Sequence, residues 1–383
     1  MRSFSSIRRR SGLYRVTASA AVTTEPDAGP VVANRSKTNL GIKSWVRPAA
    51  HGPHPGLCPL QLPATTLSPA TIWRVRFDDD AGLDTSEVQD LRGSGGGGGG
   101  GIGGRVAIGG GGLGVVGLVI YFLISQFTGI SPSAGGVGSG LTGLGSGQQV
   151  DNGQLSSECK TGADANKKHD CAIVAIINSV QDYWTLQMSR SGQTYRKAPT
   201  KFFTGGVRTG CGSATSDTGP FYCPADSDVY IDLTFFDELK TRFGAQGGLF
   251  TEAYVLAHEY GHHVQNLIGT SKKGTGTGPT SGSVRLELQA DCYAGVWGNH
   301  ATTTPTETGK PLISDVTQDD VNSALDAASR IGDDYIQTKL GGGQVDRSKF
   351  THGSSAQRKK WFTTGFQNGD PARCDTFGTS NLG

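Results

Sequence analysis

Several features that indicate other classes of protein are scarce or missing in this sequence. The formal net charge is only +2, and the C-terminal part has no basic stripe interleaved with aromatic side chains, so we expect no nucleic-acid partner. None of the seven cysteines forms a C-x-x-C pair, which disfavours a cysteine-ligated zinc site. Residues 1–74 contain no apolar run of the signal-peptide type.

Hydrophobic residues are also few, at 35% of the chain, because glycine and an irregular N-terminal third dilute them. Glycine reaches 59 residues, and much of it lies between Gly93 and Gly147, which indicates flexible tethers. The Arg- and Pro-rich residues 1–74 show little hydrophobic periodicity, so we expect disorder there rather than a targeting peptide. Residues 151–383 have ordinary globular composition, and we expect the folded domain in that range.

One stretch stands apart because it carries no charge. Residues 106–130 contain no Asp, Glu, Lys or Arg, and their centre has the sequence LGVVGLVIYFLISQF. About 20 apolar residues are needed to cross a bilayer, so we predict a transmembrane helix here. A buried core helix is the alternative, but the glycine tracts on both sides give it no neighbour to pack against.

The charges around this stretch predict its orientation. Arg92 and Arg105 precede it, whereas the first basic residue after it is Lys160. The positive-inside rule then predicts a cytoplasmic N-terminus and an extracytoplasmic C-terminal domain at a bacterial cytoplasmic membrane. In this interpretation residues 75–105 form an acidic, then Gly-rich cytoplasmic segment, and residues 131–150 form a Gly/Ser linker.

Cysteine usage agrees with export of the C-terminal domain. Cys58 precedes the charge-free stretch and the other six cysteines follow it, and an even number in an exported domain suits disulfides. Six cysteines allow fifteen pairings. Proximity along the chain favours Cys159–Cys171 and Cys211–Cys223, which leaves Cys292 to pair with Cys374.

Hydrophobic periodicity predicts an α+β domain. We expect helices over residues 171–188, 235–243, 250–268, from 284 onward and over 316–340, and strands over 202–207 and 229–233. Strands and helices do not alternate regularly in this order, which favours an α+β fold over a parallel α/β fold.

The central predicted helix carries His258, Glu259 and His262 in an H-E-x-x-H pattern. Residues four apart share one face of a helix, so both imidazoles can bind one metal ion while Glu259 reaches a bound water. Neutral imidazole is a good zinc ligand, and a zinc-bound water beside a carboxylate base is a hydrolytic nucleophile near pH 7. The motif therefore predicts a hydrolase that uses one Zn²⁺ ion.

Catalytic zinc usually has three protein ligands, so one more is expected. The extended metzincin motif is excluded, because Gln265 and Ile268 stand where that motif has glycine and a third histidine. Glu287 and Asp291 form an i, i+4 pair on the next predicted helix. Glu287 would complete a His₂Glu set, and Asp291 would accept a hydrogen bond from a ligand imidazole. A solvated helix face is the alternative, but the neighbouring residues are mostly apolar or small.

Other polar residues carry weaker signals. His263 lies about 100° around the helix from His262, so we expect it to be structural. His352 could be a catalytic residue that helps to hold an oxyanion, or it could be structural. Tyr230 and Asp232, on the strand before the metal helix, could flank the substrate or pack in the core.

Four stretches resemble the bacterial neutral zinc metallopeptidases: HEYGHHVQN, ELQADCYAG, GCGSATSDTGPFYCPADSDVYIDLTFFDEL and FTHGSSAQRKKWFTTGF. The resemblance covers about residues 76–377. It implies a zincin-like fold of the gluzincin type, with one N-terminal membrane span. It also implies that His258, His262 and Glu287 bind zinc and that Glu259 is the base.

Residues 1–74 have no counterpart in that family. We therefore expect an upstream start-site misassignment, with translation beginning at Val75 from a GTG codon. Peptides from residues 16–74 in the native protein would contradict this expectation.

These observations together predict a membrane-anchored zinc metalloendopeptidase that acts on protein or peptide substrates. The alternative is a catalytically idle, zinc-containing binding or scaffold protein of the cell envelope. The presence of Glu259 disfavours that alternative, because a structural zinc site needs the histidines but does not need a carboxylate base.

Overall fold

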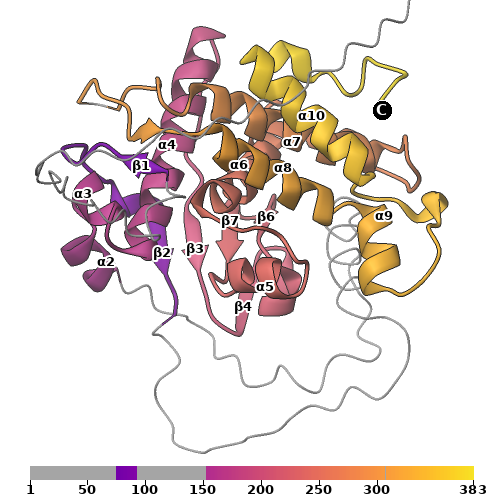
Figure 1. Ribbon diagram of the computed structural model, residues 1–383. Helices are drawn as coiled ribbons and strands as arrows, with labels where there is room; N and C mark the ends of the chain where they lie inside the picture. The colour runs from indigo at the N-terminus through magenta and orange to yellow at the C-terminus, as the bar shows by residue number, and fades with distance from the viewer. Residues whose placement is uncertain (1–74, 93–151, 307) are drawn as a thin grey trace, which may run out of the picture. The chain divides into compact units, whose positions relative to one another are not determined.

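The computed structural model describes residues 75–92, 152–306 and 308–383 (Figure 1). These residues belong to one unit of the chain, residues 66–383. The disorder expected in residues 1–74, the membrane helix expected at 106–130 and the linker expected at 131–150 all lie outside the described ranges.

Three β-sheets are present in the described ranges. The largest has the strand order β2 (Val88–Asp90), β3 (Thr200–Phe202), β7 (Asp228–Ile231) and β6 (Phe221–Cys223). The first three strands are parallel, and β6 pairs with β7 in the antiparallel direction. Two antiparallel pairs complete the set: β1 (Arg76–Phe77) with β8 (Ile313–Asp315), and β4 (Gly206–Thr209) with β5 (Gly212–Thr215).

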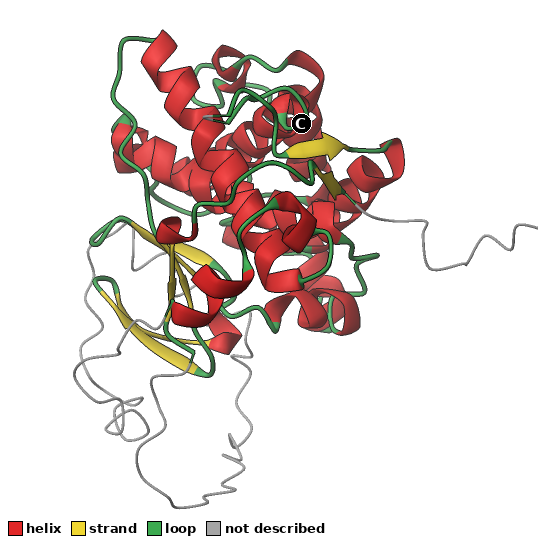
Figure 2. Cartoon of the chain, turned by 90° about the vertical axis from the view of Figure 1, so that its left-hand side faces the viewer, coloured by secondary structure: helices red, strands yellow, loops and turns green. Residues whose placement is uncertain are grey.

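Helices make up most of the rest, and most strands lie to one side of them (Figure 2). The α-helices are α2 (Gly153–Glu158), α3 (Gly162–Ala165), α4 (His169–Arg190), α5 (Phe235–Thr241), α6 (Leu249–Leu267), α7 (Gly282–His300), α8 (Gln318–Arg330), α9 (Asp333–Tyr335) and α10 (Ser355–Asn368). Shorter helical segments are η1 (Thr85–Glu87), η2 (Ser216–Thr218), η3 (Thr270–Lys273), η4 (Ile336–Leu340), η5 (Arg347–Lys349) and η6 (Pro371–Cys374).

The predicted α+β class is confirmed, and most predicted elements lie within a few residues of the observed ones. The helix expected over 250–268 is α6, and the helix expected from 284 is α7. The long helix expected over 316–340 is divided into α8, α9 and η4, with a break at Ile331 and Gly332. Helix α10 and the strands before residue 92 were not predicted.

The N-terminal strands belong to the same fold as the C-terminal residues, whereas the sequence predicted a separate segment. Beyond the strand pairing, the buried Glu87 carboxylate accepts hydrogen bonds from Asn178 (2.8 Å) and Gln181 (3.0 Å) and pairs with Lys197. Residues 75–92 therefore form part of the same fold as residues 152–383, through the pairing of β2 with β3 and the contacts of Glu87 with α4.

The three predicted disulfides are confirmed. Cys159–Cys171 joins the end of α2 to α4, Cys211–Cys223 joins the β4–β5 turn to β6, and Cys292–Cys374 joins α7 to η6. Disulfides of this kind are typical of proteins that fold in an oxidising compartment outside the cytoplasm.

Within residues 75–92, 152–306 and 308–383, no helix is both long enough and apolar enough to cross a membrane.

Candidate metal centre

Helix α6 presents the H-E-x-x-H residues at the centre of the fold. Its residues from Phe250 to Gln265 are all buried, so the helix is enclosed on every side rather than amphipathic. Gly261 lets α7 come close, because a Cβ at this position would lie only 3.0 Å from the Cα of Ala290. The close approach brings Glu287 of α7 opposite the two histidines of α6.

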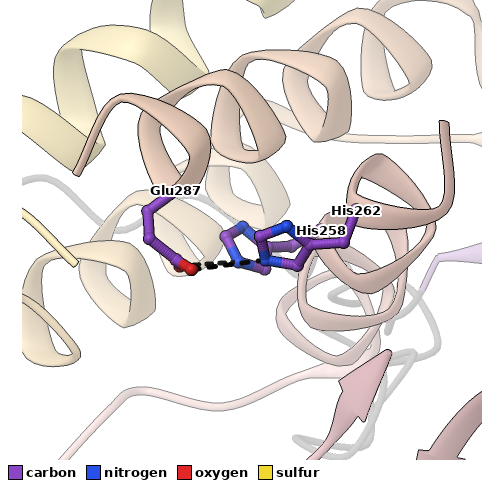
Figure 3. Close-up of side chains that lie close together, drawn as sticks. All are labelled: His258, His262 and Glu287. Carbon is purple, nitrogen blue, oxygen red and sulfur yellow. Dashed lines mark ion pairs between the residues drawn. The ribbon is translucent and has the colours of Figure 1, made fainter. Parts of the chain in front are cut away.

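His258, His262 and Glu287 converge from these two helices (Figure 3). Nε2 of His258 lies 3.2 Å from Oε2 of Glu287, and Nε2 of His262 lies 3.4 Å from Oε1. The three side chains are buried, and their potential ligand atoms all lie within 4.8 Å of one another. This is the set of side chains that the sequence predicted.

The donor set fits a zinc ion. Two imidazole nitrogens and a carboxylate are the ligands of many catalytic zinc sites, in which the fourth position stays open. Each imidazole also has its Nδ1 held by another side chain, which directs Nε2 toward Glu287. Fixing the second ring nitrogen in this way is usual for zinc-binding histidines.

Asp291 holds the first imidazole. Its Oδ1 lies 2.9 Å from Nδ1 of His258 and accepts a 2.7 Å hydrogen bond from the hydroxyl of Tyr254. The Asp291 side chain is completely buried. It therefore occupies the place and has the partner that its i, i+4 spacing from Glu287 predicted.

Gln265 holds the second imidazole, and sequence reasoning missed it. Its Oε1 lies 2.9 Å from Nδ1 of His262, and its Nε2 donates to the carbonyl of Leu286 at 2.8 Å. Gln265 entered the sequence argument only as the residue that excludes the metzincin motif. Its i, i+3 spacing from His262 was the available signal.

The protein groups at the site have strongly shifted pKa values. The pKa of Glu259 is raised to about 7, mainly by burial. His258 lowers this pKa and Glu287 raises it. Burial lowers the pKa of His262 to about 4. Burial by itself would lower the pKa of His258, but the neighbouring Asp291 and Glu287 carboxylates raise it to about 10. Without zinc His258 would therefore be protonated, so that zinc binding must displace a proton.

Glu259 lines the same cleft as the three candidate ligands and forms a hydrogen bond with β6. The backbone N–H of Tyr222 donates to Oε2 of Glu259 at 2.9 Å. A carboxyl group with a pKa near 7 suits a general base that works at neutral pH. The carboxylate, its hydrogen-bond donor and the two histidines thus form one cluster around the α6 motif.

His352 lines the same cleft and is held by Asp333. Nδ1 of His352 lies 3.2 Å from Oδ1 of Asp333, while Oδ2 of Asp333 accepts the backbone N–H groups of Thr351, His352 and Gly353 at 2.7–2.9 Å. Burial lowers the pKa of His352, but Asp333 outweighs it and the net shift is upward. Sequence reasoning found the histidine but not its carboxylate partner.

A cleft of about 960 Å³, part of it open to solvent, contains the site. Its lining includes the three proposed zinc ligands as well as Glu259 and His352. It also includes several apolar residues. Six of its apolar lining residues are here called the apolar wall: Phe235, Phe243, Val255, Ile331, Ile336 and Leu340.

Three other residues that the sequence singled out lie outside the cleft wall. Tyr230 stacks on Phe221 with ring centroids 5.1 Å apart, and Asp232 accepts hydrogen bonds from the loops around it. Tyr230 and Asp232 are both buried, and their contacts are with the sheet and its loops and not with the cleft. His263 is also buried, with its two ring nitrogens 3.1 Å from the hydroxyl of Tyr222 and 2.6 Å from the carbonyl of Arg196.

Comparison with known proteins agrees with this geometry. The chain is 48% identical over 231 residues to the uncharacterized protein Rv2575 of Mycobacterium tuberculosis, covering 59% of this chain and 77% of that protein. It is 41% identical over 317 residues to the uncharacterized protein YpfJ of Escherichia coli K12, covering 80% of this chain and 99% of that protein. No solved structure matched the chain. The model of one family, "Putative neutral zinc metallopeptidase", matches residues 76–377, and the chain belongs to this family.

Proposed function

We propose that the protein is a zinc-dependent metalloendopeptidase with a gluzincin-type site. The observation that carries this proposal is the position of Glu259, which is buried beside the His258, His262 and Glu287 cluster and open to the same cleft. A purely structural zinc site would require the three ligands but no carboxyl group with a pKa near 7.

In the proposed reaction, three side chains bind zinc and a fourth transfers protons. His258, His262 and Glu287 would hold one Zn²⁺, which when bound supplies a Lewis acid that polarises a carbonyl and lowers the pKa of water. Glu259 would take the proton from the attacking water and deliver one to the leaving amine. The N–H of Tyr222 keeps the Glu259 carboxylate in place between these two transfers.

His352 would assist as a hydrogen-bond donor to the oxyanion. Its Nδ1 faces Asp333, so Nε2 is the ring atom that can meet a substrate. Because Asp333 raises its pKa, His352 is a better donor at neutral pH than an ordinary histidine.

The cleft suits a peptide substrate with an apolar side chain near the scissile bond. The residues of its apolar wall are partly exposed except Val255, which is buried. Covering that wall with an apolar substrate side chain removes apolar surface from water, which favours binding by roughly 25 cal/mol per Å² buried.

The domain is proposed to act on the extracytoplasmic side of the cytoplasmic membrane. The three disulfides support an oxidising location, and the charge-free residues 106–130 support attachment to the membrane. Protein or peptide substrates of the cell envelope would then be within reach.

The test is proteolysis by the purified full-length chain, with Glu259→Gln as the matched control. We expect the wild type to cleave members of a broad peptide library, and the variant to be slower by about 100-fold or more, the usual contribution of a general base. Zinc content should be equal in both, as measured by metal analysis. A folded, zinc-loaded wild type that is no more active than the variant would favour the idle scaffold instead.

A further inference from the structure

A buried arginine lies next to the metal site and lines the same cleft. Arg358 of α10 is 3% exposed, and its guanidinium meets the Asp291 carboxylate in a fork. Nε donates to Oδ2 at 2.9 Å and Nη2 donates to Oδ1 at 2.9 Å. Two parallel hydrogen bonds of this kind fix the orientation of a carboxylate more firmly than a single contact can.

The remaining contacts of Arg358 anchor it to the scaffold. Nη2 lies 3.3 Å from the hydroxyl of Tyr254, and Nη1 donates to the carbonyl of Ile331 at 3.2 Å. Nη2 also lies 3.4 Å from Nδ1 of His258, the nitrogen that faces Asp291. The guanidinium therefore touches α6, α7 and the end of α8 at once.

Two glycines allow α10 to bring this arginine so close. A Cβ at Gly365 of α10 would lie 1.9 Å from the carbonyl oxygen of Cys292, and a Cβ at Gly295 of α7 would lie 2.1 Å from that of Phe362. The two helices consequently pack with their backbones in direct contact. This packing places Arg358 against Asp291 across the helix interface.

The charges explain why a cation is needed at this position. Glu259, Glu287 and Asp291 are three buried carboxyl groups in one cluster, and unpaired buried charges are costly. When all three are ionised, Arg358 together with one divalent cation balances them. Zinc alone would leave the cluster with a net negative charge.

We propose that Arg358 is a positioning residue for the metal site, acting through Asp291. It holds the carboxylate at the angle at which Oδ1 receives Nδ1–H of His258, so that Nε2 of His258 is directed toward Glu287 and is free to bind zinc. The second imidazole needs no such cation, because the neutral amide of Gln265 holds His262.

The first experiment compares Arg358→Met with Lys359→Met in the full-length protein. Lys359 is the next residue of the same helix and is exposed, so its variant makes the same charge change without touching the site. Zinc affinity is measured by competition with a chromophoric chelator. We expect Arg358→Met to weaken zinc binding by about 10–100-fold, the range typical for partners of metal ligands, and Lys359→Met to leave it unchanged.

A double-variant cycle shows whether Arg358 affects zinc binding through Asp291 or acts on the zinc site directly. Asp291→Asn should weaken zinc binding by itself, and adding Arg358→Met to it should cause little further loss, because the arginine no longer has a carboxylate to hold. Fully additive losses would overturn the proposal. So would an Arg358→Met variant that binds zinc as tightly as the wild type.

Arg358→Lys covers the case in which Arg358→Met fails to fold. Lysine keeps the charge but cannot form the fork, so this variant should fold and still bind zinc more weakly than the wild type. Folding is followed by circular dichroism and thermal unfolding. An arginine with a merely structural role would lower stability without changing the zinc affinity of the folded fraction. Because zinc binding is measured without a substrate, the result is independent of whether the protein proves to be a peptidase.

Discussion

His263 is a buried imidazole that follows the candidate zinc ligand His262 in the chain, and we expect it to make stability depend on pH. Its nitrogens face the hydroxyl of Tyr222 and the carbonyl of Arg196, and burial lowers its pKa to about 4. In the unfolded chain the pKa should be about 6.5. Between these values only the unfolded chain binds the proton, so stability should fall as the pH falls from about 6.5 to about 4.

The check is urea unfolding at pH 7, 6 and 5 for the wild type and His263→Gln. Both proteins are studied with a chelator present, which removes the contribution of zinc release. The free energy of unfolding should decrease with falling pH less steeply in the variant, which has no proton to gain at this position. Identical slopes would show that His263 titrates normally in the folded protein.

The candidate metal ligands could be predicted from the sequence because the spacing within each helix is local. Helical spacing alone puts His258 and His262 on one face, and the same spacing joins Glu287 to Asp291. Arg358 could not be predicted, since it stands in an Arg-Lys-Lys run that usually indicates a solvated face. Its burial depends on where α10 packs, which no local pattern specifies.

Among the elements, η4 forms part of the apolar wall of the cleft and offers a test of substrate preference. Ile336 of η4 lines the cleft, whereas Lys339 of the same turn is exposed. Ile336→Asp should lower kcat/KM for peptides with a leucine near the scissile bond by roughly 10–200-fold, the effect of changing an apolar pocket contact by about 1–3 kcal/mol.

Matched peptides with leucine and with serine at that position measure the preference directly. Lys339→Asp is the control, because it adds the same carboxylate outside the cleft. We expect Ile336→Asp to reduce the ratio of kcat/KM for the two peptides and Lys339→Asp to leave it unchanged. If the wild type cleaves both peptides equally well, the apolar wall does not contact the substrate side chain.

The elements themselves were predictable to different degrees. Long buried helices such as α4 and α6 have strong apolar patterns, and their predicted ends were close to the observed ones. Helix α10 was missed, although Ser354 and Gln357 form a capping box before Trp361. Strands β1 and β2 are two and three residues long, too short to show an alternating pattern.

At the scale of the whole molecule, the folded unit needs its N-terminal strands. Val75, Phe77 and Val88 are buried in the main core, and each such side chain contributes roughly 1.5–3 kcal/mol. A chain that begins at Asn152 would lose these contacts and leave the partners of Glu87 without their carboxylate. Compared with a chain that begins at Val75, we expect it to be unfolded or to melt at least about 10 °C lower.

Thermal unfolding by circular dichroism of the two purified chains checks this prediction. Comparing the full-length protein with the chain that begins at Val75, which lacks residues 1–74, controls for shortening the chain. Equal melting temperatures for chains beginning at Val75 and Asn152 would mean that the N-terminal strands are dispensable.

The contact between β2 and the start of the C-terminal part also limits how the chain can meet a membrane. Asn152 accepts the backbone N–H of Asp90 at 2.8 Å and donates to the carbonyl of Val88 at 2.6 Å. The chain thus leaves the fold at Arg92 and rejoins it beside the point of departure. Residues 92 and 152 therefore lie on the same side of any membrane to which the protein is attached.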